Sequence, residues 1–425
     1  MNIDEIIQKY VPRARQTRLL ILTSLEWMLV AAGVMVLSLT LPSVIRSFNA
    51  GDALQGAMAS AVFFGMLIGA LTSGLISDLM GRKWTNIFLM LVAGVFSGLT
   101  ALSTSPLQFA LFRFLSGLGY GGLLPVVNAY LTEFTAIRIR GVFLTLQEAS
   151  WALGSIAVGL FTILTVDSLG WRWSYGFLML WSLPLIVITL MLPESPKFAF
   201  FKKGKNALEK ILGSRIEEDI EAKPRVKMPV GALFTKRFLT RTIMIWASWF
   251  SVSFVYYGLF VWAPRIFESK GLTAASSLRY TFFMLLMQLP GYLLATLMIE
   301  TVGRKKSLAF FFIGTGISAI IMSAVTTQPA LIAASVLISL FCMGTWAMVY
   351  AYTPELYPTE MRALGNGTSG MMARIAGIIA PYITGFLMSI TGNVLFVMTV
   401  MAILCGASAI LVSRYAVETK GTAIE

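Results

Sequence analysis

The chain has 425 residues, of which 57% are hydrophobic and only 12% are charged. A soluble globular protein carries about twice that share of charged residues, so the composition excludes a water-soluble fold and indicates a polytopic membrane protein. The net charge of +13 does not indicate nucleic-acid binding, because the basic residues are spread over short polar segments and do not line one surface.

Residues 1–18 are polar and precede a long apolar run that lacks a cleavage site. We therefore expect a cytoplasmic N-terminal segment and no cleaved signal peptide. Residues 3–10 could form a short amphipathic helix on the inner face of the membrane, or could be a frayed terminus.

Twelve apolar runs are long enough to cross the membrane as helices, which satisfy their own backbone hydrogen bonds. Six of them precede a central polar stretch and six follow it. We place them near residues 19–47, 56–77, 85–104, 107–131, 142–166, 174–192, 240–263, 279–299, 307–326, 329–353, 364–388 and 393–414.

The polar stretch 194–238 predicts a cytoplasmic linker with one or two surface helices, one of them within 207–220. The chain is thus expected to be an all-α membrane protein with two pseudo-symmetric six-helix bundles, 19–193 and 239–415, and a cytoplasmic tail, 416–425. Basic residues gather in the loops on one side, which places both termini in the cytoplasm.

Polar motifs recur at an offset of 222 residues (303 − 81), which indicates an internal repeat of the kind found in transporters. The basic triplet at 81–83 returns at 303–305. Three further residues of the first half, Asp78, Glu133 and Arg140, have a charged counterpart at the same offset. The repeated positions that we assign to a cytoplasmic gate are Asp78, Gly81, Arg82, Lys83, Glu133 and Arg140 in the first half, and Glu300, Gly303, Arg304, Glu355 and Arg362 in the second.

The spacing Gly74-x-x-x-Asp78-x-x-Gly81-Arg82-Lys83 resembles the signature of the major facilitator superfamily. In that family this motif latches the cytoplasmic gate. Glycines permit close packing and a tight turn, and Asp78 can hold nearby cations at the membrane surface. A loop that only sets topology would account for Arg82 and Lys83 but not for the Asp and Gly spacing.

Arg113 precedes Gly117, Gly119 and Gly121 and resembles the second motif of the superfamily, a buried Arg ahead of glycines. Glycines four apart allow a neighbouring helix to approach closely. The repeat is lost here, because the equivalent position is Ser335, so the two halves should differ in chemistry.

Three motifs, at 193–197, 354–358 and 418–421, resemble those of sugar porters and organic ion transporters. Within that group, segments 146–152 and 373–381 are most similar to bacterial niacin transporters and animal organic anion carriers. The resemblance implies a transporter with a small organic substrate.

Four charged residues fall inside predicted spans and must face the bundle interior, because a charge in hydrocarbon is costly. They are Glu26, Arg113, Glu148 and Arg374. One interpretation pairs them as permanent structural salt bridges. The other gives Arg374, flanked by Gly367, Gly370 and Gly377, a carboxylate substrate to bind.

The seventh span presents a face of Trp249, Ser253, Tyr256 and Phe260 that could stack a flat ring, although such a stripe can also be simple packing. Tyr256 and Tyr257 are the preferred substrate contacts, because each also offers a hydroxyl group. Asn366, Gln288 and Asn128 could supply further hydrogen bonds.

The chain contains no His and no nucleotide-binding motif, so proton coupling would fall to a carboxylate. Glu26 and Glu148 are the candidates, with Arg113 as the counter-charge. We predict a secondary transporter, a proton symporter of an aromatic monocarboxylate such as nicotinate, that works by alternating access in the cell membrane. Alternatives are a sugar or organic-cation transporter, or a receptor that has lost transport. We expect a monomer with no catalytic residues, no cofactor, no metal and no nucleic-acid partner.

Overall fold

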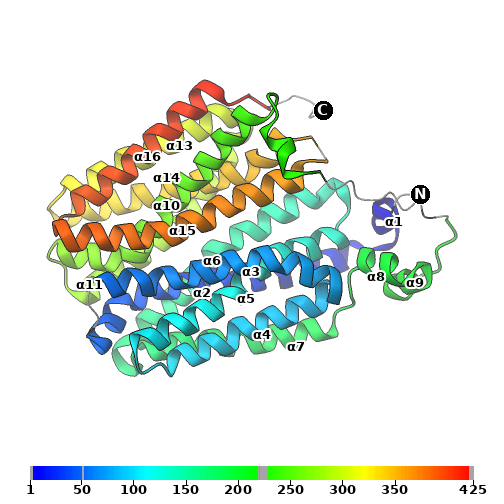
Figure 1. The fold of residues 1–425 in the computed structure, drawn as a ribbon, viewed down its shortest axis with the longest axis horizontal. Coiled ribbons are helices and arrows are strands. Elements are labelled where there is room, and N and C mark those ends of the chain that lie inside the picture. Colours follow the sequence, from blue (N-terminus) through cyan, green and yellow to red (C-terminus); the bar gives the residue numbers. More distant parts are fainter. Residues whose placement is uncertain (1–2, 50–51, 219, 221–227, 359, 421–425) are drawn as a thin grey trace. The chain divides into compact units, whose positions relative to one another are not determined.

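The computed structural model describes residues 3–49, 52–218, 220, 228–358 and 360–420. All regular secondary structure within these ranges is helical (Figure 1). Twelve helical segments are long and apolar enough to cross a membrane, which confirms the all-α prediction. They are α2 (Arg13–Phe48), α3 (Asp52–Met80), α4 (Arg82–Ala101), α5 (Pro106–Phe134), α6 (Ile137–Leu169), α7 (Arg172–Met191), α10 (Leu239–Ser269), α11 with α12 (Ala274–Leu286, Gln288–Thr301), α13 (Arg304–Ala324), α14 (Gln328–Tyr352), α15 (Arg362–Thr391) and α16 (Val394–Tyr415).

The eighth span is interrupted, whereas the sequence predicted one continuous run over 279–299. α11 ends at Leu286, Met287 forms a turn and α12 begins at Gln288. Pro290 has no N–H to donate to the carbonyl group of Leu286, and its ring crowds that carbonyl, so the helix cannot continue regularly through this point.

Short helices form outside the spans: α1 (Ile3–Tyr10), α8 (Pro196–Lys203), α9 (Lys205–Leu212) and two 3₁₀ segments, η1 (Val230–Phe234) and η2 (Thr353–Leu356). The helix predicted over 207–220 is wrong in extent. It ends at Leu212, because Gly213 adopts a left-handed conformation with φ of 73° and closes the helix. Residues 219 and 221–227 of the predicted linker, like 1–2 and 421–425, lie outside the described ranges.

The chain forms two compact units, each of which is discontinuous in sequence. The first comprises Met1–Val36 with Ala61–Arg225, and the second comprises Leu37–Ser60 with Val226–Glu425. Within the second unit, segment 37–60 packs on α10 and α15, where Ser38 Oγ donates to the carbonyl group of Phe260 and Ser60 Oγ donates to that of Ile378 (2.7 Å). The division into functional bundles at 19–193 and 239–415 stays a prediction.

Glycines bring the helices of the first unit together. A Cβ atom at Gly117 would lie 2.2 Å from the carbonyl oxygen of Val62, and one at Gly121 would lie 2.1 Å from that of Met66, both on α3. Gly119 contacts α4 in the same way. The close approach predicted from these glycines is confirmed, and larger side chains at these positions would separate the helices.

The internal repeat is visible in the packing of each unit. In the first unit α4 packs against α5 and α7, and in the second its counterpart α13 packs against α14 and α16. α10 and α15 run in the same direction, because Trp246 Nε1 donates to Thr368 Oγ1 (3.3 Å) while Trp262 Nε1 donates to the carbonyl group of Pro381 (3.0 Å).

Candidate functional site

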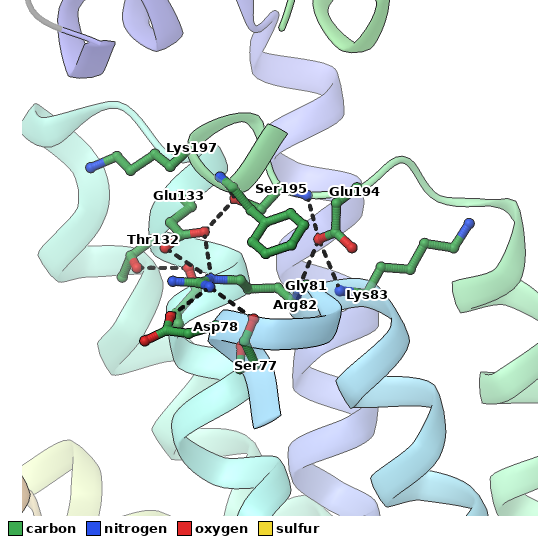
Figure 2. Close-up of polar contacts among 12 residues, drawn as sticks. Ser77, Asp78, Gly81, Arg82, Lys83, Thr132, Glu133, Glu194, Ser195 and Lys197 are labelled. Atoms are coloured by element: carbon green, nitrogen blue, oxygen red, sulfur yellow. Dashed lines mark hydrogen bonds and ion pairs between the residues drawn. The ribbon is translucent and has the colours of Figure 1, made fainter. Parts of the chain in front are cut away.

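The basic triplet of the first unit forms an ion-pair cluster between α3, α4 and α5 (Figure 2). Arg82 Nε lies 3.2 Å from the carboxylate of Glu133, and Arg82 Nη1 lies 3.0 Å from Asp78. The side chain of Glu133 is only 4% exposed, whereas that of Asp78 is 67% exposed. The Arg82–Glu133 pair is therefore the buried centre of the cluster, and Asp78 is its solvated rim.

Glu194 caps the first turn of α4 in the same cluster (Figure 2). Its Oε1 atom accepts hydrogen bonds from the backbone N–H groups of Arg82 (2.9 Å) and Lys83 (3.1 Å). These donors have no partner within the helix, and a carboxylate there also interacts favourably with the helix dipole. Ser195 Oγ donates to Glu133, so the segment after α7 is tied both to the helix end and to the buried ion pair.

The second unit repeats this arrangement at corresponding residues. Arg304 Nε lies 3.0 Å from Glu355, and Arg304 Nη2 lies 3.6 Å from the exposed Glu300. Glu418 accepts from the backbone N–H of Arg304 (2.8 Å), and Thr419 Oγ1 donates to Glu355. The tail motif at 418–421 therefore has, as far as it is described, the role that Glu194 and Ser195 have in the first unit.

The Glu and Arg that lie seven residues apart in each repeat do not pair with each other. Glu133 pairs with Arg82, while Arg140 donates to the carbonyl group of Thr135 (3.1 Å) and to Asp4 (2.8 Å). Likewise, Arg362 donates to the carbonyl group of Tyr357 (3.3 Å). Sequence spacing alone could not assign these partners.

Gly81 and Gly74 differ sharply in what surrounds them. Gly81 has φ of +94°, and a Cβ atom there would lie 2.3 Å from Glu194 Oε2, so the turn requires glycine. At Gly74 a Cβ atom would meet nothing within 4 Å, so the close packing expected at this position is not found. Gly303 repeats the geometry of Gly81, with φ of +101°.

Gly81→Ala is expected to destabilise the protein by about 2 kcal/mol, through backbone strain and the contact with Glu194. Gly74→Ala is the matched control and should stabilise the protein by about 0.5–1 kcal/mol, because alanine is the better helix former. Thermal unfolding of the purified proteins measures both. Equal shifts for the two variants would contradict this reading of the turn.

Glu26 is fully buried in α2 and is held by neutral groups. Its carboxylate accepts from Asn86 Nδ2 (2.9 and 3.0 Å) and from Thr189 Oγ1 (3.0 Å), and no ion pair between described residues includes it. The permanent salt bridge that was one interpretation of the sequence is therefore absent at Glu26. A buried carboxylate with only neutral donors is costly when ionised.

Arg113 is also fully buried but does not pair with Glu26. Its Nη1 donates to the carbonyl group of Gly33 (2.8 Å), its guanidinium lies 5.5 Å from the ring of Tyr175, and Nε and Nη2 have no partner. No direct contact between Arg113 and Glu26 therefore supports the predicted role of Arg113 as the counter-charge.

Two further predicted residues lie elsewhere in the first unit. Glu148 is half-buried in α6, and Asn128 accepts a hydrogen bond from Gln147.

Most of the predicted substrate contacts lie together in the second unit, in an aromatic cluster between α10 and α14. Trp346 is at its centre, with ring centroids 5.6 Å from Trp249, 6.0 Å from Tyr256, 6.3 Å from Tyr257 and 5.7 Å from Tyr350. Gln288 joins the cluster by donating to the hydroxyl group of Tyr256 (3.2 Å). Polar atoms that are buried here without a partner are Trp346 Nε1, Gln288 Oε1 and Ser253 Oγ.

Arg374 lies on α15 at the depth of this cluster. Residues of α15 lie beside residues of α10 that are 119–122 positions earlier in the chain (381 − 262 and 368 − 246). Arg374 therefore lies level with residues 252–255 of α10. Its side chain is half-buried and makes no hydrogen bond or ion pair with a described residue. A Cβ atom at Gly367 or Gly370 would meet nothing within 4 Å, and Asn366 is exposed, so open space adjoins this stretch of α15.

Sequence reasoning missed four candidate residues that the tertiary structure places in these clusters. Asn86 and Thr189 hold Glu26, while Trp346 and Tyr350 complete the aromatic cluster. Asn86 could have been found because an amide inside an apolar span needs a polar partner. Trp346 and Tyr350 could have been found because aromatic residues four positions apart lie on one face of a helix.

Comparison with known proteins gives consistent results. The profile of the sugar (and other) transporter family matches residues 29–425. A Bacillus subtilis protein with the provisional name niacin/nicotinamide transporter NiaP is 34% identical, over 96% of this chain and 98% of its own. The niacin transporter NiaP of Acinetobacter baylyi is 30% identical, over 96% and 95%. The xylose transporter XylE from E. coli, in a partially occluded inward open conformation, superposes with a TM-score of 0.80 over 96% of this chain and 99% of its own, at 17% identity, which shows a shared fold.

Proposed function

Because this chain belongs to the sugar (and other) transporter family, a group of transporters and not of enzymes, we propose that it carries an aromatic monocarboxylate such as nicotinate together with protons. Transport would proceed by alternating access across the cell membrane, with both termini in the cytoplasm. The clusters around Arg82 and Arg304 would form the cytoplasmic gate.

The observation that carries this proposal is the guanidinium of Arg374, which has no partner among the described residues and lies at the depth of the aromatic cluster. A half-buried cation without a protein partner is suited to a carboxylate ligand, with which it can form two parallel hydrogen bonds. Trp346 and Tyr256 offer ring faces or edges to a flat heterocycle, and Gln288 offers an unsatisfied acceptor. A sugar has no charge to pair with Arg374, and an organic cation would be repelled by it.

The relatives named as niacin transporters support the same substrate class, since they align over almost the whole chain. Nicotinate, unlike nicotinamide, carries the carboxylate that Arg374 would bind. We therefore expect discrimination between the acid and the amide.

Uptake of labelled nicotinate into proteoliposomes tests the proposal. An inward proton gradient should drive accumulation, and unlabelled nicotinate should compete far better than nicotinamide, xylose or an organic cation. Equal competition by nicotinamide would reject the carboxylate–Arg374 contact. No uptake of nicotinate by the native protein would reject the substrate but not the fold.

Glu26 is the proposed proton carrier, because it is fully buried and is hydrogen-bonded only to neutral groups. Glu26→Gln should abolish proton-driven accumulation but retain exchange of nicotinate between the two sides of the membrane. The exposed acid Asp167 of the same unit gives a matched control, Asp167→Asn, that should leave both activities unchanged. If Glu26→Gln still accumulates nicotinate against its gradient, the proton must use another group, with Glu148 as the next candidate.

A further inference from the structure

The N-terminal segment, for which the sequence left open a helix on the membrane surface or a frayed terminus, forms helix α1, and the apolar face of α1 packs on the first unit. Ile3, Ile6 and Ile7 are buried in an apolar cluster of the first unit. Figure 1 shows α1 at the same end of this unit as α8 and α9. The other buried members of the cluster come from the turn before α2, the start of α2, the end of α5, the start of α6, and the linker: Val11, Leu19, Tyr130, Leu131, Phe134, Phe143, Leu208, Leu212 and Ile216.

Asp4 of α1 is the acidic partner of two cations from different elements. Its Oδ1 atom lies 2.8 Å from Arg140 Nη2 on α6 and 2.8 Å from Lys197 Nζ on α8. Burial raises the pKa of Asp4, but the hydrogen bonds and charges of Lys197 and Arg140 outweigh it, so the pKa lies below its usual value. Asp4 is therefore an ionised carboxylate at neutral pH.

Further contacts fix α1 and the start of α2 to the linker. Tyr10 donates to Glu218 (3.1 Å), Lys9 pairs with the same carboxylate, and Arg15 donates to the carbonyl group of Ile211 (2.9 Å). Gln16 Oε1 accepts from the backbone N–H of Ala136, in the turn between α5 and α6 (3.1 Å). The orientation of Asp4 is thus set by contacts along the whole segment.

The internal repeat shows what α1 adds. In each half an arginine in the first turn of a long helix, α6 or α15, donates to a backbone carbonyl group five residues earlier. Arg140 donates to Thr135, and Arg362 donates to Tyr357. Only Arg140 also has a carboxylate partner among the described residues, and that partner comes from outside the repeat. Within the described residues, the first half therefore has an acidic contact from the N-terminal segment that the second half does not repeat.

A short path through Lys197 and Ser195, both labelled in Figure 2, connects Asp4 to the buried pair Arg82–Glu133. Lys197 lies two residues after Ser195, which caps α8 and donates to Glu133. Arg140 shares the carboxylate of Asp4 with Lys197, so without Asp4 its remaining partner among the described residues would be the carbonyl group of Thr135. The cations of Arg140 and Lys197 repel each other, and the carboxylate of Asp4 offsets this repulsion. Without that carboxylate, both side chains would move apart and bind other acceptors.

We propose that Asp4 is a positioning residue of the first-half gate: it holds Arg140 and Lys197 in place, so that Glu133 remains the partner of Arg82 and Ser195. The inference rests on the proposed role of the Arg82 cluster as a gate. Through Asp4, docking of α1 would control how firmly that gate is held, and hence the rate of the conformational change but not substrate affinity.

A double-mutant cycle on the full-length purified protein tests the structural part without a substrate. Asp4→Asn should lower the midpoint of thermal unfolding by a few degrees, and Asp4→Glu should recover part of the loss. The matched control Glu217→Gln, which changes an exposed acid of the linker, should shift the midpoint by less than about 1 °C. In an Arg82→Gln background the Asp4→Asn shift should fall to less than half, although Asp4 and Arg82 are not in contact. Equal Asp4→Asn shifts in both backgrounds would overturn the proposal.

Uptake kinetics test the functional part. With nicotinate, or another substrate if the competition assay identifies one, Asp4→Asn should change the maximal rate at least about threefold and leave KM within twofold. An altered KM at unchanged maximal rate would assign Asp4 to substrate binding and overturn the gate role. If native protein transports nothing, the proposed function fails, while the unfolding cycle still decides the position of Asp4.

Discussion

Replacement of Arg374 by alanine should lower the rate of nicotinate uptake at low substrate concentration by roughly 30-fold to 100-fold, the equivalent of about 2–3 kcal/mol for a lost charge-assisted pair. Arg374 has no partner among the described residues, so its removal should leave no protein carboxylate uncompensated. The variant should therefore fold normally and lose function, which separates a ligand-binding cation from a structural one.

Two further variants sharpen this test. Arg374→Lys retains the charge but loses the planar fork and should recover only part of the activity. Arg279→Ala removes an arginine from α11 that only donates to a backbone carbonyl of its own helix, and should leave uptake unchanged. If Arg374→Ala unfolds at a much lower temperature than native protein, Arg374 has a structural role, and the anion site must be sought elsewhere.

Arg82→Ala should be the most destabilising of the gate substitutions, by about 3–5 kcal/mol, because it leaves Glu133 buried without a cation. Arg304→Ala should cost less, since its partner Glu355 is 18% exposed and can be hydrated, whereas Glu133 is 4% exposed. Thermal unfolding of both variants, beside the surface control Lys202→Ala, measures the order.

The order of these two variants is the decisive outcome. Equal loss of stability would mean that the exposure of the carboxylate does not set the energy of the pair. Recovery of Arg82→Ala by a second change, Glu133→Gln, would support the reading that the uncompensated charge causes the loss, because the amide removes that charge.

The twelve spans were readable from the sequence, because an apolar helix in lipid must satisfy its backbone internally and is about 20 residues long. The break at Met287 was less evident, since Leu286 and Gln288 lie inside one apolar run and the responsible Pro290 comes later. The repeat offset of 222 (303 − 81) also predicted that equivalent residues form equivalent clusters, as Arg82 and Arg304 do.

The partners in the ion pairs could not be predicted from the sequence. The repeated spacing of Glu133 and Arg140 named no partner for either residue, and in the structure Glu133 pairs with Arg82 and Arg140 with Asp4. An ion pair is decided by which side chains meet within about 4 Å, and helix packing brings together residues that are 51 or 136 positions apart in the chain. The same holds for Glu26, which meets Asn86.

The sequence by itself determined the membrane class, the number of spans, the repeat and the residue types available for an anion and a proton. These properties depend on composition and on short-range patterns, which are local. Only the tertiary structure decided that Trp346 is the centre of the aromatic cluster, that Arg374 lies at its depth with no partner in the described part of the chain, and that α1 docks on the first unit. Those properties depend on how distant helices pack, because burial and pairing are set by neighbours in space and not by neighbours in the chain.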